Sequence, residues 1–280
     1  MTLFELRTFL QSKLSKEEFE KLNNIFGSGN RTKIINHLHN NWKETVPSLS
    51  ADYKYRLFIE KEIENNVGKS FLQNSIFQVD NATALNIELA KAKKSVIQYR
   101  ASPQATVLTE QGLLPIAQTN ELAAVTQYNT SAQSLLNTSI FIPKNKLEEI
   151  SAKWIPENVS LIKNLERDAI DIIQKSVKET FSTGGRAKQI QKTIEESVSG
   201  IKGYRAKLIA EDQILKLHAQ IHRQQHKNIG VKQYVWRTQG DGAVRASHAA
   251  RDKEVYNYSD SPAPAEEVRC RCFEIPLIEW

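Results

Sequence analysis

The chain has 280 residues, a formal net charge of +6, 40% hydrophobic residues and 25% charged residues. Two domains with cores of their own fit this length, and the composition is globular rather than disordered or fibrous. No apolar run approaches the ~18 residues that a membrane-spanning helix needs. Acidic Glu5 and the lack of a small-residue cleavage site near the start argue against a signal peptide. We therefore expect folding in a cytoplasm and no membrane partner.

Residues 1–100 are predicted to form a helical N-terminal region. Ser15 and Glu18 have the spacing of a capping box at the start of a helix. Apolar residues recur at helical spacing near the start of the region and again farther along, at Leu3, Leu6 and Leu10 and at Leu85, Leu89, Ala92 and Val96. The region shows no repeat and no constellation of catalytic type.

Residues 101–157 are predicted to be a connecting segment. Val107 and Leu108 suggest a short strand, and residues 126–137 are rich in Ser, Thr, Gln and Asn. Helix-breaking residues punctuate the first part, at Pro103, Gly112 and Pro115.

Residues 158–280 are predicted to be a domain of three helices followed by a small β-containing cap. Apolar stripes define the helices, through Ile162, Leu165, Ala169, Ile172, Ile173 and Val177, through Ile190, Ile194 and Val198, and through Ala210, Ile214, Leu217 and Ile221. The cap should contain a strand at 234–238, a short helix at 245–251, a strand at 255–256, a loop through Pro262 and Pro264, and a strand at 270–275. The predicted fold class is therefore α+β and predominantly α-helical.

The cap gathers side chains that form sites or pin loops. Trp236 in the first strand is expected to be largely buried, because a large aromatic residue in a short alternating strand usually anchors a core. Arg245 is the expected charge partner of Asp241 or Asp252. These residues and His248 form the predicted cap network.

His248, Cys270 and Cys272 are a candidate set of ligands for a structural zinc ion. Residues i and i+2 of a strand face the same side, so one strand can present both sulfurs, with His248 arriving from the short helix. A fourth ligand, Asp252, is unproven. The preferred alternative has no cofactor: two packed thiols beside a hydrogen-bonded His248. A zinc deaminase is excluded, because it needs a Glu two residues after the His and a Pro-Cys-x-x-Cys spacing.

Three further histidines, His218, His222 and His226, recur every fourth residue on the last predicted helix. This spacing places them on one ridge, where neighbours can share a metal. Polar neighbours surround them in sequence, so we expect a solvated polar face.

A local excess of positive charge lies between Lys202 and Arg251, where ten Lys or Arg residues stand against three Asp or Glu residues. The excess indicates either a solvated helix face or a surface for non-specific DNA binding. The candidate DNA-binding residues are Lys202, Arg205, Lys207, Arg223 and Lys227.

The order of these motifs resembles the phage Mu F-like minor head proteins, a family of phage head morphogenesis, over roughly the last 120 residues. The resemblance is carried by Arg205, Ala206, Ile209, Ala210 and Asp212, by Trp236, Arg237, Thr238, Asp241, Val244, Arg245 and His248, by Asp252 and Tyr256, and by Cys270, Arg271 and Cys272. Lys253 stands where the family usually has Gly, which implies a turn that need not use a positive φ angle. Arg269 stands where Asn is common.

The resemblance implies a structural, non-enzymatic minor capsid protein of a tailed phage or prophage, located in the virion head and, during assembly, in the host cytoplasm. The implied partners are the portal protein and the major capsid or scaffold protein, with a role in head assembly and DNA packaging or delivery. Eight residues follow Cys272, so we expect no fused effector domain. The alternative function is a metal-dependent enzyme acting on nucleic acid, with His248, Asp241 and Asp252 at its centre.

Overall fold

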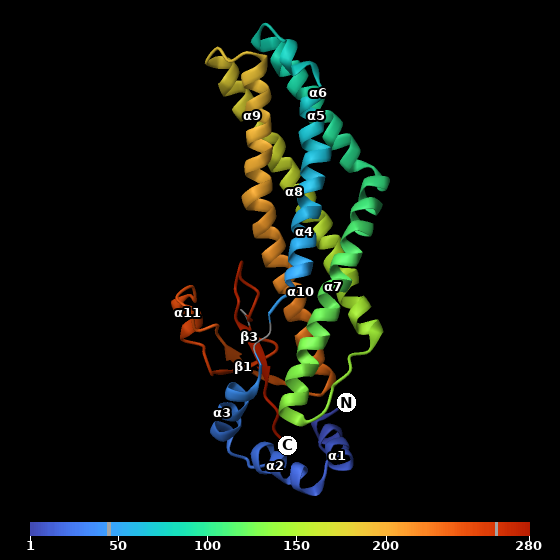
Figure 1. Ribbon diagram of the computed structural model, residues 1–280, viewed down its shortest axis with the longest axis vertical. Coiled ribbons are helices and arrows are strands. Elements are labelled where there is room, and N and C mark those ends of the chain that lie inside the picture. Colours follow the sequence, from blue (N-terminus) through green and yellow to red (C-terminus); the bar gives the residue numbers. More distant parts are fainter. Residues whose placement is uncertain (44–45, 261–262) are drawn as a thin grey trace. The chain divides into compact units, whose positions relative to one another are not determined.

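A computed structural model describes residues 1–43, 46–260 and 263–280. The first half of the chain contains helices α1 (Leu3–Lys13), α2 (Lys16–Phe26), α3 (Arg31–Asn41), α4 (Leu49–Glu62), α5 (Lys69–Leu72), α6 (Ala82–Ala101) and α7 (Pro103–Leu136). The second half contains α8 (Lys144–Ser182), α9 (Ala187–Gly200), α10 (Lys207–Asn228), β1 (Gln233–Arg237), α11 (Ala246–Ala249), β2 (Val255–Asn257) and β3 (Phe273–Pro276) (Figure 1). The fold is α+β and predominantly α-helical, as predicted.

Short segments of other helical geometry join several helices. The π-helix η1 (Ile63–Gly68) links α4 to α5, and the 3-10 helix η2 (Ser75–Gln78) precedes α6. A second π-helix, η3 (Ile201–Ala206), makes α9 and α10 one continuous helical run. The two helices predicted there are therefore joined without a loop. Among the described residues, no helix is both long enough and apolar enough to cross a bilayer.

Contacts group the described chain into two units that are discontinuous in sequence. Unit 1 comprises residues 1–49, 118–151 and 212–280, and unit 2 comprises residues 50–117 and 152–211. Helices α7, α8 and α10 contribute residues to both units. The predicted boundaries near residues 100 and 157 fall inside α6 and α8. Whether the three segments fold as independent domains stays a prediction.

The predicted connecting segment is mostly helix, because α7 covers Pro103–Leu136 and α8 begins at Lys144. The expectation of a strand at Val107 and Leu108 was wrong; both side chains are about half exposed on α7. The buried face of α7 mixes large apolar residues such as Leu113 with small or polar ones at helical spacing, which are Ala105, Thr109, Ala117, Asn120 and Ala124. Such residues make a weak hydrophobic stripe.

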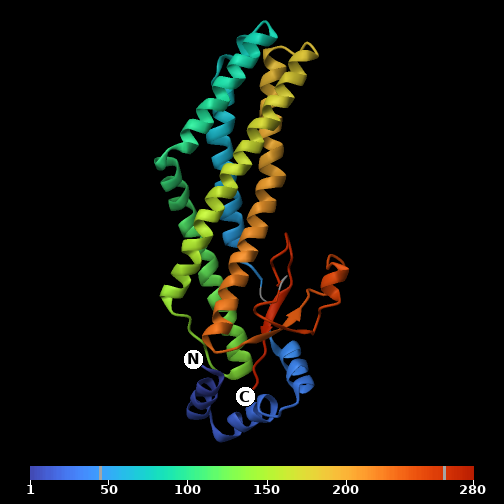
Figure 2. The ribbon, with the colours of Figure 1, turned by 180° about the vertical axis from the view of Figure 1, so that it is seen from behind.

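Unit 2 is a bundle whose helices run alongside one another, as Figures 1 and 2 both show for α6, α8 and α9. On α8 the predicted stripe is buried except for Ile172, which is 38% exposed, while neighbouring Ile170 is buried instead. Tyr55 donates a hydrogen bond to Asn158 Oδ1 at 2.6 Å, inside this core.

A buried ion-pair network crosses unit 2. The Arg100 guanidinium on α6 contacts the Glu166 carboxylate on α8, and only 8% and 1% of the two residues are exposed. It also donates to Glu62 Oε2 at 2.5 Å and to Thr109 Oγ1 at 2.9 Å. Desolvation raises the pKa of Glu166, and the hydrogen bond from Arg100 opposes that rise. Arg100 therefore keeps a buried carboxylate charged.

Unit 1 has its core between α1, α2, α3, the second half of α7 and one face of the sheet. The capping box predicted at Ser15 and Glu18 is confirmed and starts α2, with Ser15 N donating to Glu18 Oε2 at 2.9 Å. Buried residues of this core include Leu6, Leu10, Phe26, Leu38, Trp42, Tyr128, Val235 and Ile275.

The sheet of unit 1 has the order β2-β1-β3, and both pairings are antiparallel. Val235 pairs with Val255 on one side and with Ile275 on the other. Because side chains alternate along β1, Val235 joins the main core, while Tyr234 and Trp236 face a second cluster with Cys270 and Cys272. The alternation thus brings both cysteines to the face of the sheet that carries Trp236.

Candidate functional site

Trp236 anchors the second cluster and is fully buried, which confirms the prediction. The His248 ring meets its indole edge-on, with centroids 5.4 Å apart, and Tyr256 packs in a similar way at 5.8 Å. The Arg251 guanidinium lies 5.1 Å from the centre of the indole ring. The packed rings of Trp236 and Tyr256 therefore also support His248.

The one-turn helix α11 presents His248 to the cysteines. Its backbone is held where His248 N donates to the carbonyl of Arg245 at 2.9 Å. The cysteines precede β3 rather than belonging to it, because the strand begins at Phe273. Both are free thiols, and His248, Cys270 and Cys272 are all at most 5% exposed.

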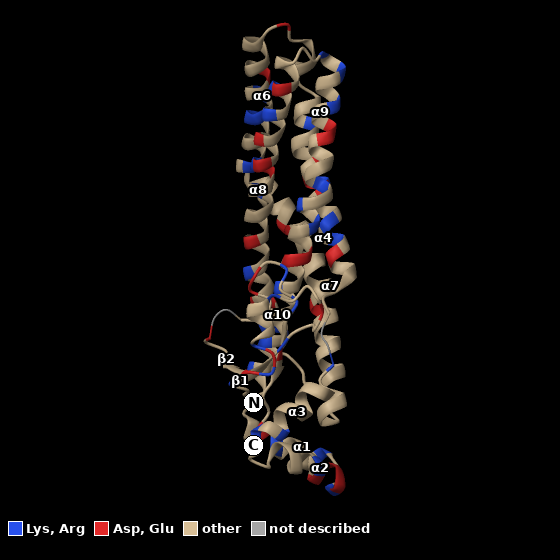
Figure 3. Ribbon diagram, turned by 90° about the vertical axis from the view of Figure 1, so that its left-hand side faces the viewer, with Lys and Arg blue, Asp and Glu red and all other residues tan. Residues whose placement is uncertain are grey.

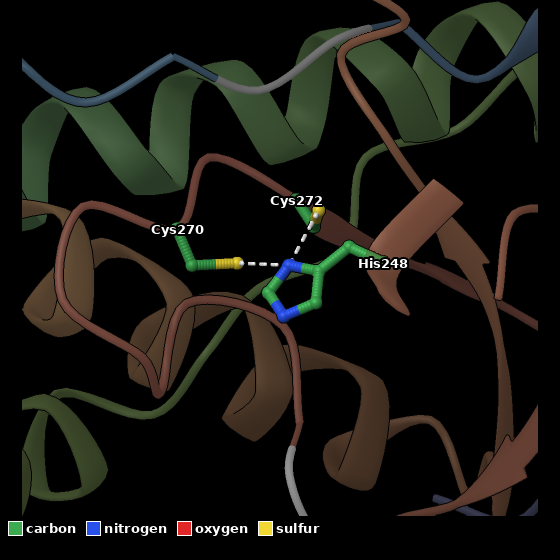
Figure 4. Close-up of side chains that lie close together, drawn as sticks. All are labelled: His248, Cys270 and Cys272. Atoms are coloured by element: carbon green, nitrogen blue, oxygen red, sulfur yellow. Dashed lines mark hydrogen bonds between the residues drawn. The ribbon is translucent and has the colours of Figure 1, made fainter. Parts of the chain in front are cut away.

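His248 Nδ1 lies 3.4 Å from Cys270 Sγ and 3.6 Å from Cys272 Sγ (Figure 4). The three atoms lie within 4.8 Å of one another. Hydrogen bonding from the Cys272 thiol lowers the pKa of Cys270 to about 5, and the same bond raises the pKa of Cys272. The contact between the two sulfurs therefore favours the thiolate form of Cys270 over that of Cys272.

The predicted pairing of Arg245 with Asp241 or Asp252 was wrong. Arg245 Nε lies 3.5 Å from Glu267 Oε2, and Arg245 Nη2 donates to the carbonyl of Val268 at 2.9 Å. Asp241 instead accepts from Arg271 at 2.5 Å. The reason is alternation: Arg271 stands between two buried cysteines, so its side chain points outward, toward Asp241.

Asp252 is also separate from the cysteine cluster in its hydrogen bonds. Asp252 Oδ1 accepts from Thr238 N at 2.8 Å and from Thr238 Oγ1 at 3.1 Å, and Oδ2 lies 3.6 Å from His39 Nε2. It therefore connects the end of β1 to the turn before β2.

Two neighbours of these residues were missed from the sequence. They are Glu267, whose Oε1 lies 3.3 Å from His248 Nε2, and His39, which lies beside Asp252.

Asp212 on α10, one of the residues that carry the family resemblance, contacts the segment that precedes Cys270. Asp212 is 5% exposed, and its Oδ1 accepts from Arg269 N at 2.9 Å, while Oδ2 accepts from Lys216 at 2.7 Å. Arg269 itself has a φ of 57°. Asp212 therefore holds the left-handed residue that leads directly into Cys270.

Lys253 also has a positive φ, of 71°, so the expectation that its turn avoids this region was wrong. Lys253 N donates to the carbonyl of Trp236 at 2.8 Å, and this bond fixes the left-handed conformation. Both departures from the family pattern, Lys253 and Arg269, thus fall where Gly or Asn is favoured.

Replacing Lys253 with glycine is expected to raise the free energy of unfolding by about 1 kcal/mol. The strain of the left-handed conformation is removed, and the greater freedom of glycine in the unfolded chain offsets only part of the gain. Denaturant unfolding measures the change. The matched control is Lys227→Gly, on the exposed surface of α10, where the same substitution should cost about 1 kcal/mol. A loss of stability in both variants would contradict the prediction.

The three histidines of α10 do not form the solvated face that was expected. His218, His222 and His226 are 3%, 5% and 0% exposed. His222 Nε2 lies 3.0 Å from the carbonyl of Ala124, and Tyr258 Oη lies 2.7 Å from His226 Nδ1. The ridge is buried because it packs against aromatic rings that come from distant segments, among them Trp42, Tyr128 and Tyr258.

Most of the candidate DNA-binding residues are close to carboxylates. Lys202 lies 2.7 Å from Glu64. The other ion pairs are Arg205 with Asp168 at 2.5 Å, Lys207 with Glu211 at 3.6 Å, and Arg223 with the buried Glu274. Lys227 is exposed. Figure 3 likewise shows acidic and basic residues interspersed along α8 and α9. This compensation weakens the local field for a polyanion.

Comparison with known proteins shows a family similarity over part of this chain. Residues 171–275 match the family model described as phage Mu protein F like protein. An uncharacterized protein of Haemophilus influenzae is 28% identical over 228 residues, which cover 79% of this chain and 49% of that protein. The chain thus spans about half the length of this curated relative. No solved structure matches. Over residues 171–275, the chain is therefore similar to the phage Mu protein F like family.

Proposed function

We propose that this chain is a minor head protein of a tailed phage or prophage, acting in head morphogenesis. The observation that carries the proposal is the family match over residues 171–275. The matched region includes α9, α10 and the whole cap up to Ile275. It therefore covers the elements that build the His248 cluster and hold it in place.

We further propose that the protein is located in the virion head and associates with the portal and with the major capsid or scaffold protein. A structural role is supported by the way in which the polar side chains of the cap are used. Asp212, Asp241 and Asp252 each receive hydrogen bonds that fix a loop or a strand end. Such contacts give a fixed surface that suits assembly.

The alternative, a nucleic-acid enzyme centred on His248, Asp241 and Asp252, gains no support from these contacts. Asp241 pairs with Arg271, Asp252 holds Thr238, and His248 faces the cysteines. A carboxylate pair for acid and base chemistry would need the two Asp side chains to share one reacting site. A weak, non-specific contact with DNA, in support of packaging or delivery, stays a prediction.

The proposal predicts that the protein copurifies with virions or procapsids in far fewer copies than the major capsid protein, as a portal-associated component should. Quantitative mass spectrometry of particles from the phage or induced prophage that encodes the chain measures this ratio. A prophage with this gene deleted supplies the control for carry-over, and its heads should be malformed or empty by electron microscopy. The absence of the protein from both kinds of particle, with normal filled heads in the deletion, would refute the function.

A further inference from the structure

The cluster of His248, Cys270 and Cys272 has the dimensions of a metal site. Bonds of about 2.3 Å to sulfur and about 2.0 Å to nitrogen, at tetrahedral angles, set the separation of a ligand nitrogen and a ligand sulfur at about 3.5 Å. His248 Nδ1 lies 3.4 Å and 3.6 Å from the two sulfurs. All three side chains point toward one another in Figure 4, from α11 and from the segment before β3. The nitrogen-to-sulfur separations therefore fit one shared ion, and the two sulfurs lie within 4.8 Å of each other, against about 3.8 Å on a tetrahedral ion.

The surroundings of His248 also favour Nδ1, the nitrogen nearest the two sulfurs, as the metal ligand. His248 Nε2 lies 3.3 Å from Glu267 Oε1, on the side of the ring away from the sulfurs. Metal-binding histidines usually donate their other ring N–H to a carboxylate or carbonyl, which fixes the tautomer. Glu267 lies near Nε2 without a formed hydrogen bond, and Nδ1 is the ring nitrogen that faces the two sulfurs.

The three side chains leave a fourth position that solvent can reach. A shallow hollow opens beside the cluster and is lined by Gln239, Val244, Arg245 and Arg269 together with the three candidate ligands. Neither Asp241 nor Asp252 belongs to the described group of atoms that converge on the point. A water molecule from the hollow can complete a four-coordinate site.

The chemistry of the three atoms selects the kind of ion. Two thiolates and an imidazole suit zinc and other soft or borderline ions, whereas magnesium and calcium require oxygen ligands. A disulfide is the competing use of the two sulfurs, but residues so close in sequence bridge only with strained geometry. Both thiols are free in the structure.

We propose that His248 Nδ1, Cys270 Sγ and Cys272 Sγ bind one zinc ion, whose fourth position opens to solvent in the hollow beside α11. The site ties α11 and the segment before β3 to the Trp236 face of the sheet. This inference rests on the geometry of the cap and does not depend on the proposed role in the phage head.

Titration of cobalt into the reduced, metal-free full chain tests the proposal, because cobalt occupies zinc sites and reports thiolate ligands by charge-transfer absorption. We expect one equivalent to bind with that absorption and to be displaced by zinc. The Cys270→Ser/Cys272→Ser variant should lose the absorption, and His248→Gln should weaken binding. His218→Gln, which changes a histidine that is equally buried at 3% exposure, should leave both unchanged.

A second pair of variants separates the proposed ligands from general damage to the fold. Glu267→Gln should weaken metal affinity about 10- to 100-fold, as the loss of a carboxylate partner of a ligand histidine does. Glu266→Gln, the same change at the next residue, should not. Zinc should also protect both thiols of the wild-type chain from alkylation, a readout that needs no variant. The absence of stoichiometric cobalt binding by the wild-type chain, or a Cys270–Cys272 disulfide under reducing conditions, would overturn the proposal.

Discussion

Replacement of Arg100 with methionine is expected to lower the free energy of unfolding by about 3–5 kcal/mol at neutral pH, because removing one partner of a buried ion pair leaves a buried charge without compensation. Methionine keeps most of the apolar stem, so the main loss is the guanidinium. Glu166, 1% exposed, would then retain, among the described residues, the hydrogen bond from Asn66 at 3.0 Å. Denaturant unfolding followed by circular dichroism measures the change.

The pH dependence of the Arg100→Met variant provides a second readout. Without the guanidinium, burial and the neighbouring Glu62 both raise the pKa of Glu166 above its usual value of 4.5. A carboxyl whose folded-state pKa is raised contributes stability fully below the unfolded value and loses it as pH rises through the folded value. The deficit of the variant should therefore shrink as the pH falls toward about 5.

An exposed pair in the same unit supplies the control. Arg205 pairs with Asp168, but their side chains are 39% and 51% exposed. Solvent screens such a pair, so Arg205→Met should change stability by at most about 1 kcal/mol. Equal losses in the two variants would show that the buried network does not carry the predicted stability.

Which side chains of the cap lie in its core could be predicted, because successive residues of a strand face opposite sides of the sheet. The alternation around Trp236 correctly placed that side chain in a core, and His248, Cys270 and Cys272 meet as candidate ligands should. Which charges pair could not be predicted, because Arg245 has several acids within reach along the chain. The outward direction of Arg271 decided the outcome, and that direction follows from the burial of its two neighbours.

The helical part was harder to predict where polar or small residues line a buried face. Helix α7 has Asn120 and Thr109 at fully buried positions, so polar residues interrupt its stripe between large apolar residues such as Leu113 and Ile116. The buried Glu166 directly follows Leu165 of the apolar stripe of α8. A charged residue at the edge of a buried stripe was the available signal in the sequence for a buried ion pair. Its partner Arg100 lies 66 residues earlier in the sequence, and sequence periodicity carries no information on that pairing.

The buried histidines of α10 are expected to make the protein acid-sensitive in a pH range above the titration of ordinary carboxylates. Burial lowers the pKa of His218 to about 4 from the usual 6.5. Burial also lowers the pKa of His222, with a contribution from its two histidine neighbours, and that of His226, where Glu274 opposes the effect. All three are therefore neutral rings in the folded protein; His226 packs against Trp42, His222 against Tyr128, and His218 against His222.

The direction in which the free energy of unfolding changes with pH follows from the linkage between folding and protonation. A histidine with a depressed folded-state pKa contributes stability that is complete above the unfolded value of 6.5, and that stability is lost as the pH falls toward the folded value. For His218 alone, the loss between pH 6.5 and about 4 amounts to about 3 kcal/mol. His222, which is fully buried, should add to it.

Unfolding free energies measured in denaturant at several pH values between about 7 and 5 test this expectation, since most carboxylates stay ionised there. The wild-type chain should lose stability steadily over the range, and His218→Gln should flatten the slope because glutamine does not titrate. The matched control is His37→Gln on α3, where the ring is only partly buried and the slope should change little. A wild-type stability that is constant over this range would show that the ridge is hydrated and protonated in the folded protein.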